Sequence, residues 1–266
     1  EILANQKRFD EALPFLDEAE KLDPNDINIF LIRADIYLWQ SNHAEAMDVI
    51  EYGLSIATEK EDRCELFLEM ADIWEDQEKY PEVINSLRNA VREDAMNEEA
   101  LNRLWFCTEL TETHEDSVQF HEMLIEENPY SYLAWFNLGH ALVGLGKYEE
   151  ALDAFSYVNA IEEKFDLGII SSGDVLMLLD RPNEAMVFYQ EAIKITKPDK
   201  ELYLKVAGCY EVMNDMAKSR AFLRKAIAID PYFDEAHYHI GETYRMEEDW
   251  SRAISSYERA VKLSKD

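Results

Sequence analysis

Small and bulky residues recur along this chain at a constant interval of about 34 residues. A first series of small residues falls at Ala71, Gly139, Gly173, Ala207 and Gly241, and every gap in it is one such interval or two. A second series lies twelve residues later and a third, mostly bulky, four residues after that: Val83, Ser117, Ala151, Ala185, Ser219 and Ala253, then Leu87, His121, Phe155, Tyr189, Leu223 and Tyr257. Upstream, Ala34, Ala46 and Ile50 keep the spacing but are displaced by three residues at the stretch TEKEDR. A constant period of this length indicates an array of identical structural units.

The pattern within each unit predicts two amphipathic helices joined by a short turn. In the central unit the first helix is expected at Tyr132–Leu145 and the second at about Tyr148–Ala160. The small residues Gly139 and Ala151 allow the two helices to approach closely where they cross. Gly146 is expected to end the first helix, because glycine readily adopts the left-handed conformation of a helix C-terminus.

The prolines agree with these boundaries, and two departures from the period predict local changes. Pro81 and Pro182 fall at the start of second helices, where a missing N–H is tolerated, whereas Pro14 lies deeper in its helix. The three-residue insertion near 59–63 is expected to lengthen the preceding helix or loop. Trp105 stands where other units have a small residue, so the helices of that unit are expected to be pushed apart.

These residues resemble the tetratricopeptide repeat, whose pattern is Trp-x-x-Leu-Gly-x-x-Tyr, then Ala-x-x-x-Phe, then Pro, over about 34 residues. The central unit matches it with Trp135, Leu138, Gly139, Ala151 and Phe155. The resemblance implies an all-α fold, a right-handed α-solenoid superhelix of stacked antiparallel helix pairs. We expect a single array over residues 1–266, with a partial repeat at 1–26 and full repeats starting near 27, 64, 98, 132, 166, 200 and 234. Since the chain begins inside a unit, we expect it to be a fragment of a longer protein.

Composition and charge exclude several kinds of partner. The chain has no apolar run long enough to span a membrane, so we expect no membrane insertion. The net charge of −30 argues against nucleic acid and anionic lipid, and residues 1–131 carry −23 of it. The three cysteines are odd in number and far apart, so we expect no disulfide framework and a cytoplasmic location.

No constellation in the sequence predicts catalysis, a cofactor or a metal site. The stretch GLGKY contains Lys147 followed by Tyr148, and it lacks the spacing and the Ser or Thr of a nucleotide-binding loop. His237 and His239 are two apart and therefore lie on different sides of a helix. His114, expected in a turn between helices, has no second histidine at metal-ligand spacing. We therefore expect a non-enzymatic chain that binds no cofactor.

The resemblance also implies where a partner would bind. In proteins similar to this one the first helix of each unit lines a concave groove, through its second, fifth, ninth, twelfth and thirteenth residues. Six of the seven fifth positions are apolar, and several ninth positions are acidic. The expected groove residues are Asp35, Trp39, Asp72, Glu75, Asp76, Phe106, Phe136, His140, Ile170, Asp174, Tyr238 and Glu242. The alternative is that the fifth-position residues pack against the neighbouring helix and that the carboxylates are ordinary solvated charges.

These features predict a non-catalytic interaction scaffold that binds a protein or peptide segment with basic and apolar residues. Two other functions stay open at this stage. The chain could be the regulatory repeat region of a larger enzyme or signalling protein, or it could be a self-assembly module. A clamp for the C-terminal carboxylate of chaperones is not expected, because the inward Asn and Lys residues that it requires are missing.

Overall fold

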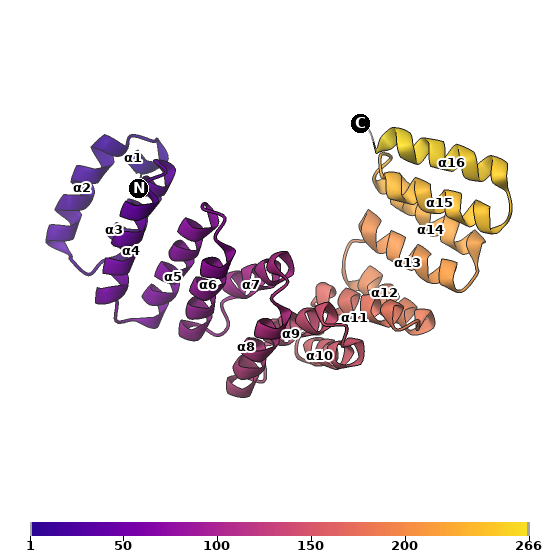
Figure 1. Cartoon of the computed structure of the whole chain (residues 1–266), viewed down its shortest axis with the longest axis horizontal. Helices are drawn as coiled ribbons and strands as arrows, with labels where there is room; N and C mark the ends of the chain where they lie inside the picture. Colours follow the sequence, from indigo (N-terminus) through magenta and orange to yellow (C-terminus); the bar gives the residue numbers. More distant parts are fainter. Residues whose placement is uncertain (1, 265–266) are drawn as a thin grey trace. The chain divides into compact units, whose positions relative to one another are not determined.

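The computed structural model describes residues 2–264, and every regular element in that range is an α-helix (Figure 1). The sixteen helices of this range are α1 (Ile2–Asn5), α2 (Phe9–Leu22), α3 (Ile27–Trp39), α4 (His43–Ile56), α5 (Lys60–Glu75), α6 (Tyr80–Glu93), α7 (Glu98–Thr111), α8 (His114–Glu127), α9 (Tyr132–Gly144), α10 (Tyr148–Ile161), α11 (Asp166–Leu178), α12 (Pro182–Ile195), α13 (Lys200–Val212), α14 (Met216–Ile229), α15 (Asp234–Met246) and α16 (Trp250–Leu263). The all-α prediction is confirmed. The helices of the central unit end within one residue of their predicted limits.

Within residues 2–264, the turn inside each helix pair passes through the left-handed region of backbone conformation. One residue in every such turn has a positive φ, and it is glycine only at Gly146, where φ is 72°. The others are Lys7, Ser41, Glu78, Glu112, Asp180, Asn214 and Glu248. Consecutive members are separated by one repeat period, except for Ser41 and Glu78, which enclose the insertion. The left-handed ending expected at Gly146 is thus a property of the repeat, and seven other side chains accept its steric cost.

The insertion is accommodated differently from the prediction. The preceding helix α4 has the same 14 residues as the other second helices, and only residues 57–59 connect it to α5. The additional residues instead lengthen α5, which has 16 residues where α3 has 13. The prediction of a longer preceding helix or loop was therefore wrong, because the charged stretch from Lys60 to Arg63 continues the helix that follows.

The contacts divide the chain into two compact units, Glu1–Leu145 (unit 1) and Gly146–Asp266 (unit 2). We call the first helix of each pair its A helix and the second its B helix. Each A helix packs against its own B helix in most pairs, and consecutive A helices also contact one another, as α3 does α5 and α11 does α13. Since the division falls between α9 and α10, a single array over 1–266 and the crossing at Gly139 and Ala151 stay predictions.

The pair α7 and α8 departs from this pattern. Helix α7 contacts α9 far more extensively than it contacts its own partner α8, and α8 packs on α9 as well. The ring of Trp105 extends from α7 to Phe136 and His140 on α9, with centroid distances of 5.8 and 5.0 Å. The predicted separation of these two helices is confirmed, since a large aromatic residue occupies the position where other pairs have a small one.

Within pairs, the small residues of A helices pack against the bulky residues of B helices. Ala34, Ala46 and Ile50 belong to one buried cluster, and Ala207 and Leu223 belong to another. Where the small residue is glycine, the contact is closer still. A Cβ atom added at Gly173 would lie 2.5 Å from the ring of Tyr189, and one at Gly241 would lie 2.6 Å from the ring of Tyr257. The contact between the first and third series of residues therefore closes each of these pairs.

Candidate functional site

The expected groove carboxylates of unit 1 are Asp35, Asp72, Glu75 and Asp76, and all of these except Asp35 contact a side chain of a neighbouring helix. Arg103 on α7 reaches across to α5, where its Nη2 lies 2.6 Å from Asp72 Oδ1 and 2.7 Å from Glu75 Oε2. Its Nη1 lies 3.4 Å from Glu99. Asp76 at the end of α5 accepts a contact of 2.6 Å from Nε2 of His43, which is the first residue of α4. Arg103 thus compensates Asp72 and Glu75 of the expected acidic wall, and Asp76 is paired with the imidazole of His43.

Asp35 and Glu69 lie close to Asp72, and neither has an ion pair or hydrogen bond within the described residues. Asp35 on α3 is half-buried, and burial together with the nearby Asp72 raises its pKa. Glu69 on α5 has a buried oxygen without a hydrogen-bond partner. Burial, with Asp35 and Asp72 adding to it, raises the pKa of Glu69 to about 8, although Arg103 opposes the shift. Glu69 is therefore protonated over most of the neutral range, because its ionised form would be poorly solvated beside two other carboxylates.

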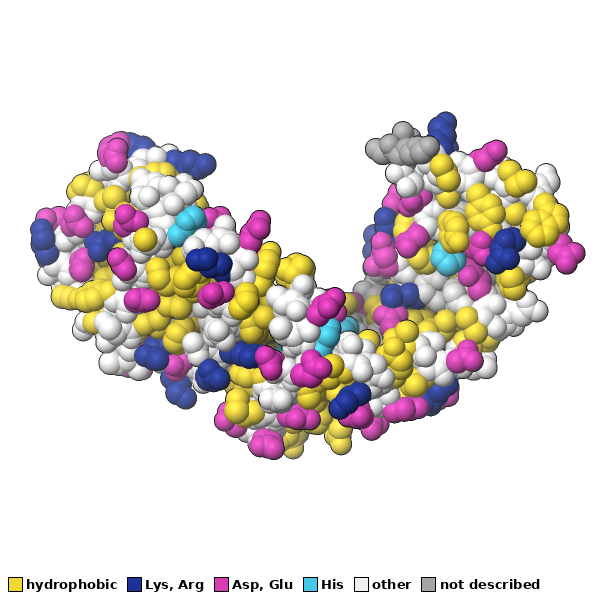
Figure 2. All heavy atoms as spheres, viewed as in Figure 1, with side chains coloured by type: hydrophobic (Ala, Val, Ile, Leu, Met, Phe, Trp, Pro, Cys, Tyr) yellow, Lys and Arg dark blue, Asp and Glu magenta, His cyan; other side chains and the backbone are white. Residues whose placement is uncertain are grey.

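Large apolar side chains are exposed on the same face of unit 1. Trp39 at the end of α3 is 48 % exposed, and Phe106 on α7 is 57 % exposed. Figure 2 shows apolar side chains interleaved with acidic and basic ones over the side of unit 1 that is turned to the viewer. We call the surface formed by the A helices of a unit its A face. In unit 1 this face combines exposed aromatic rings with carboxylates.

Phe136 was expected to line the groove, but it is only 2 % exposed. Its ring packs edge-on against Trp105 and against His140, at centroid distances of 5.8 and 4.5 Å. Burial among these rings lowers the pKa of His140 to about 4, so its imidazole is neutral near pH 7. The expectation that Phe136 lines the groove was wrong, because its ring is buried against Trp105 and His140 as the packing alternative proposes.

The expected groove residues of unit 2 on α11 also have partners inside the protein. Asp174 accepts hydrogen bonds from Nζ of Lys205 on α13, at 2.8 and 2.9 Å, and from the hydroxyl of Tyr189, at 2.7 Å. Ile170 is half-buried and packs against the cluster formed by α11, α12 and α13. Leu31 and Leu204 occupy the same repeat position and are likewise half-buried against their own clusters. At these fifth positions the packing alternative is the one that the structure favours.

A pocket of about 350 Å³ opens in unit 2, where side chains of α13 and α15 meet above Met216 of α14. Its apolar walls are Val212, Met216, Tyr238 and Met246, and all of these except Met216 are about half exposed. Its polar lining consists of Glu211, His239, Glu242, Thr243 and Arg245. Two expected groove residues, Tyr238 and Glu242, therefore meet in one concave site.

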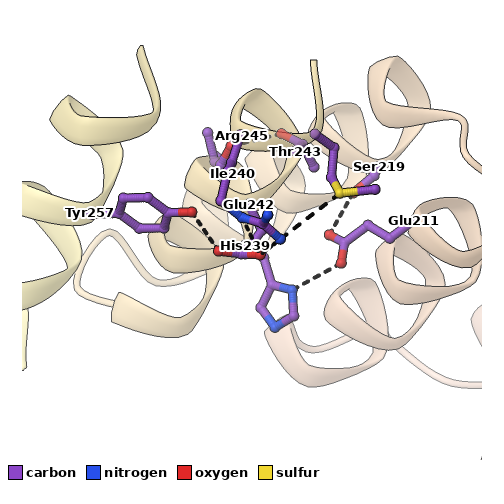
Figure 3. A network of polar contacts seen from close by, with 9 residues as sticks. Glu211, Ser219, His239, Ile240, Glu242, Thr243, Arg245 and Tyr257 are labelled. Atoms are coloured by element: carbon purple, nitrogen blue, oxygen red, sulfur yellow. Dashed lines mark hydrogen bonds and ion pairs between the residues drawn. The ribbon is translucent and has the colours of Figure 1, made fainter. Parts of the chain in front are cut away.

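The polar residues of this pocket form a hydrogen-bonded network (Figure 3). Glu211 accepts from Ser219 Oγ at 2.9 Å and from His239 Nδ1 at 3.1 Å. Glu242 accepts from Nε and Nη2 of Arg245, at 3.0 and 2.6 Å, and from the hydroxyl of Tyr257. The hydrogen bond to Glu211 raises the pKa of His239, and the bond from Arg245 lowers the pKa of Glu242. Each carboxylate of the pocket is thus held by groups of the protein itself.

The remaining candidate chemistry has structural explanations. His114 is the first residue of α8, and its ring fills the space beside Gly144. Among the described residues, no three His, Cys, Asp or Glu side chains are grouped closely enough to hold a metal ion. The three cysteines are free and buried, and burial raises the pKa of each thiol to about 11. None of the described helices has the length and apolar character required to cross a membrane.

Several residues of these sites were not singled out in the sequence. Glu69 could have been noticed as a single charge inside the otherwise apolar run from Leu66 to Met70. Glu211, Val212, Arg245 and Met246 stand at the twelfth and thirteenth positions, which the repeat pattern already assigns to the inward side. The pairing of Glu211 with His239 was not foreseeable, because it joins side chains of two consecutive repeats, whereas Arg245 pairs with Glu242 on its own helix.

Comparison with known proteins agrees with this architecture. Three stretches, residues 122–153, 200–233 and 236–266, match models of the tetratricopeptide repeat. The chain is 23 % identical over 263 residues to the TPR repeat-containing protein YpiA of Bacillus subtilis. This alignment covers 96 % of this chain and 60 % of YpiA. It is 24 % identical over 119 residues to the BBSome complex member BBS4 of Mus musculus, covering 45 % of this chain and 23 % of that protein. The chain thus spans less than two thirds of the length of either relative.

Solved structures show the same fold at low sequence identity. The C-terminal part of a TPR repeat-containing protein from Cytophaga hutchinsonii aligns with a TM-score of 0.62 and 17 % identity, covering 90 % of this chain and 97 % of that one. YrrB, a TPR protein with an unusual peptide-binding site, aligns with a TM-score of 0.54 and 19 % identity, covering 69 % of this chain and 94 % of YrrB. At these identities the likeness concerns the fold alone. The matched repeats and the helix pairs of residues 2–264 together identify the chain as a tetratricopeptide repeat protein.

Proposed function

We propose that this protein is a non-catalytic interaction scaffold whose A faces bind a segment of a protein or peptide partner. The observation that carries the proposal is the exposure of large apolar side chains on A helices beside carboxylates. Trp39 and Phe106 provide such side chains in unit 1, and Tyr238 provides one in unit 2. Exposed aromatic residues at a concave or grooved surface are typical anchors for a partner.

The partner is expected to contribute apolar anchors and basic side chains to unit 1. Asp35 is not ion-paired in the described residues, and residues 1–131 carry a charge of −23. A lysine or arginine of the partner would reduce the repulsion between Asp35 and Asp72, which, besides burial, raises the pKa of Asp35. The contribution of Asp72 is weaker than the sequence suggested, because Arg103 already neutralises it.

Comparisons support the class of partner, although not its identity. YrrB is a TPR protein with an unusual peptide-binding site, and BBS4 is a member of the BBSome complex. Both proteins support a chain that acts by binding other proteins. A cytoplasmic location is part of the proposal and rests on the free, buried thiols of the three cysteines.

A peptide library provides the test. Random linear peptides displayed on phage are selected on the purified chain, and the enriched sequences are synthesised and measured by fluorescence anisotropy. We expect enriched peptides to contain aromatic or aliphatic residues with Lys or Arg, and their affinity to fall as the salt concentration rises above about 0.15 M. Phe106→Ser should weaken this binding, whereas Met123→Ser, at an exposed position of the B helix α8, should not.

Selection of no peptide above background, or equal affinity for the two variants, would contradict binding at the A face of unit 1. Enriched peptides that lack basic residues and bind independently of salt would leave the scaffold function in place. That second result would remove the basic partner from the proposal.

Self-association is a second candidate, and the outer face of α16 favours it. Ile254 and Val261 are more than half exposed there and line a pocket of about 550 Å³ with Tyr257. The residue one repeat before Val261 is Ile227, which is half-buried against the following A helix. Light scattering over a range of concentrations, with Ile254→Asp as the comparison, tests this candidate. A monomer mass at every concentration would eliminate it.

A further inference from the structure

The pocket between α13 and α15 has an imidazole nitrogen, Nε2 of His239, that is without a hydrogen-bond partner among the described residues. The carboxylate oxygens of Glu211 and Glu242 all accept hydrogen bonds from groups of the protein. In contrast, Nε2 of His239 has no such partner among the described residues, whereas Arg245 has both Glu242 and Tyr257 as side-chain partners. Both side chains line the pocket. When the imidazole is protonated, the site therefore offers Nε2–H of His239 as a donor at the edge of an apolar cavity.

The charges of the pocket are balanced in pairs. His239 is paired with Glu211, and Arg245 is paired with Glu242, with nitrogen–oxygen distances of 3.1 and 2.6 Å. A charged side chain entering the cavity would lose its hydration and would find no carboxylate or cation that is not already paired. An uncharged group avoids this cost, and burial of an apolar side chain against Val212, Tyr238 and Met246 is favourable.

We propose that this pocket holds one large, uncharged apolar side chain of an extended partner segment, while a main-chain carbonyl of that segment accepts a hydrogen bond from Nε2 of His239. The proposal rests on the proposed function, because it gives the A face of unit 2 its own specificity. A volume of about 350 Å³ is sufficient for a leucine, methionine or phenylalanine side chain with the adjacent peptide group. In this unit the occupant is selected by shape and neutrality and not by basic charge.

The protonation state of His239 controls the donor. When the imidazole is protonated, Nδ1–H donates to Glu211 and Nε2–H is available to a carbonyl oxygen. After loss of a proton, Nδ1–H remains with Glu211 and Nε2 becomes an acceptor. Glu211 of α13 raises the pKa of His239 by its hydrogen bond and its charge, and Glu235 and Glu242 of α15 add to the shift. Arg245 faces Glu242 and Tyr257 of α16 caps the same carboxylate. Binding should therefore be tighter at pH 6 than at pH 8.5.

Methionine methyl groups allow the pocket to be observed directly. The whole chain is labelled with 13C at methionine methyls, and N-acetyl-leucinamide is added, since this probe contains one apolar side chain and peptide carbonyls. N-acetyl-lysinamide and N-acetyl-glutamic acid amide are the charged comparison probes. We expect the leucine probe to shift the Met216 and Met246 signals, with a dissociation constant on the order of millimolar, and to leave exposed Met96 unchanged.

Variants separate the apolar wall from the donor. Val212→Ser should weaken binding of the leucine probe about three- to tenfold, because the cavity loses apolar surface. Val187→Ser is the matched control, since Val187 is an exposed valine of the same unit outside the pocket. His239→Phe should retain the wall but abolish the dependence on pH. Circular dichroism of each variant establishes that the helices are intact.

The outcomes are unambiguous. Equal shifts from the leucine, lysine and glutamate probes would overturn the proposal, as would indifference of the affinity to Val212→Ser. Persistence of the pH dependence in His239→Phe would overturn the role of the imidazole. A library-selected peptide that binds the chain without shifting Met246 would leave the scaffold function standing and remove this pocket from it. If no peptide is selected but the leucine probe binds as expected, the pocket stands and the scaffold function is contradicted.

Discussion

Substituting alanine at Gly173 and at Gly208 provides a direct test of how the helix pairs are closed. Both glycines lie inside A helices of unit 2, α11 and α13, each of which has 13 residues. A Cβ atom at Gly208 would meet nothing within 4 Å, whereas one at Gly173 would lie 2.5 Å from Cε1 of Tyr189. The two substitutions are therefore chemically identical and differ only in the space around them.

The expected magnitudes follow from two opposing effects. Alanine in a helix interior is favoured over glycine by about 1 kcal/mol, so Gly208→Ala should raise the free energy of unfolding by about that amount. The same gain applies at Gly173, but the ring of Tyr189 must move by about 0.9 Å to reach an ordinary contact of 3.4 Å. Tyr189 is buried and its hydroxyl is bonded to Asp174, so this movement disturbs both packing and a hydrogen bond. Overpacking of this kind costs about 1–3 kcal/mol, which is the expected difference between the two variants.

Urea unfolding followed by circular dichroism, with each variant compared with the parent chain, measures this difference. Because a repeat array can unfold in stages, the comparison should use the transition that contains unit 2. Adding Tyr189→Leu to Gly173→Ala should cancel part of the loss, since a smaller side chain leaves room for the new methyl group. Equal stability of Gly173→Ala and Gly208→Ala would refute the contact between the small and bulky series.

Three further predictions concern titration and backbone conformation. The free energy of unfolding should fall as pH rises from about 4.5 to 8. The pKa of Glu69 in the folded chain is raised to about 8, so folded Glu69 retains a proton that the unfolded chain releases. Denaturation at pH 5 and 8.5 should show Glu69→Gln more stable than the parent by at least about 1 kcal/mol at the higher pH only. Burial lowers the pKa of His121 to about 4, and its Nδ1 and Nε2 contact the Ser117 carbonyl and Asn137. The free energy of unfolding should therefore fall as pH falls from 6.5 towards 4. An NMR titration that gave the ring a pKa near 6.5 would contradict this. Glu248→Gly should stabilise the chain by about 1 kcal/mol, because the φ of Glu248 is 59° and glycine adopts a positive φ without steric cost. For the same reason Gly146→Ala should destabilise the chain by a similar amount. The midpoints of urea unfolding measure both changes.

The sequence by itself determined the repeat, the helix pairs and their boundaries. Periodic small and bulky residues identify which side of each helix is buried, and the turn between helices recurs with the period. These features depend on local sterics and on contacts between the two helices of one pair, such as Gly173 with Tyr189 and Gly241 with Tyr257. For this reason the central helices were predicted to within one residue, and the left-handed conformation at Gly146 was predicted correctly.

Only the tertiary structure decided which groove residues are available to a partner. Arg103 neutralises Glu75 from 28 residues away, Lys205 neutralises Asp174 from 31, and His239 holds Glu211 from 28. Each of these partners belongs to the next repeat along the chain. A periodic pattern assigns a residue to the inward side, but it contains no information on whether a longer side chain of the following helix reaches it. Charge compensation, the burial of Phe136 under Trp105 and the pocket at Tyr238 all arise from packing between consecutive repeats. They therefore appear only when the repeats are stacked.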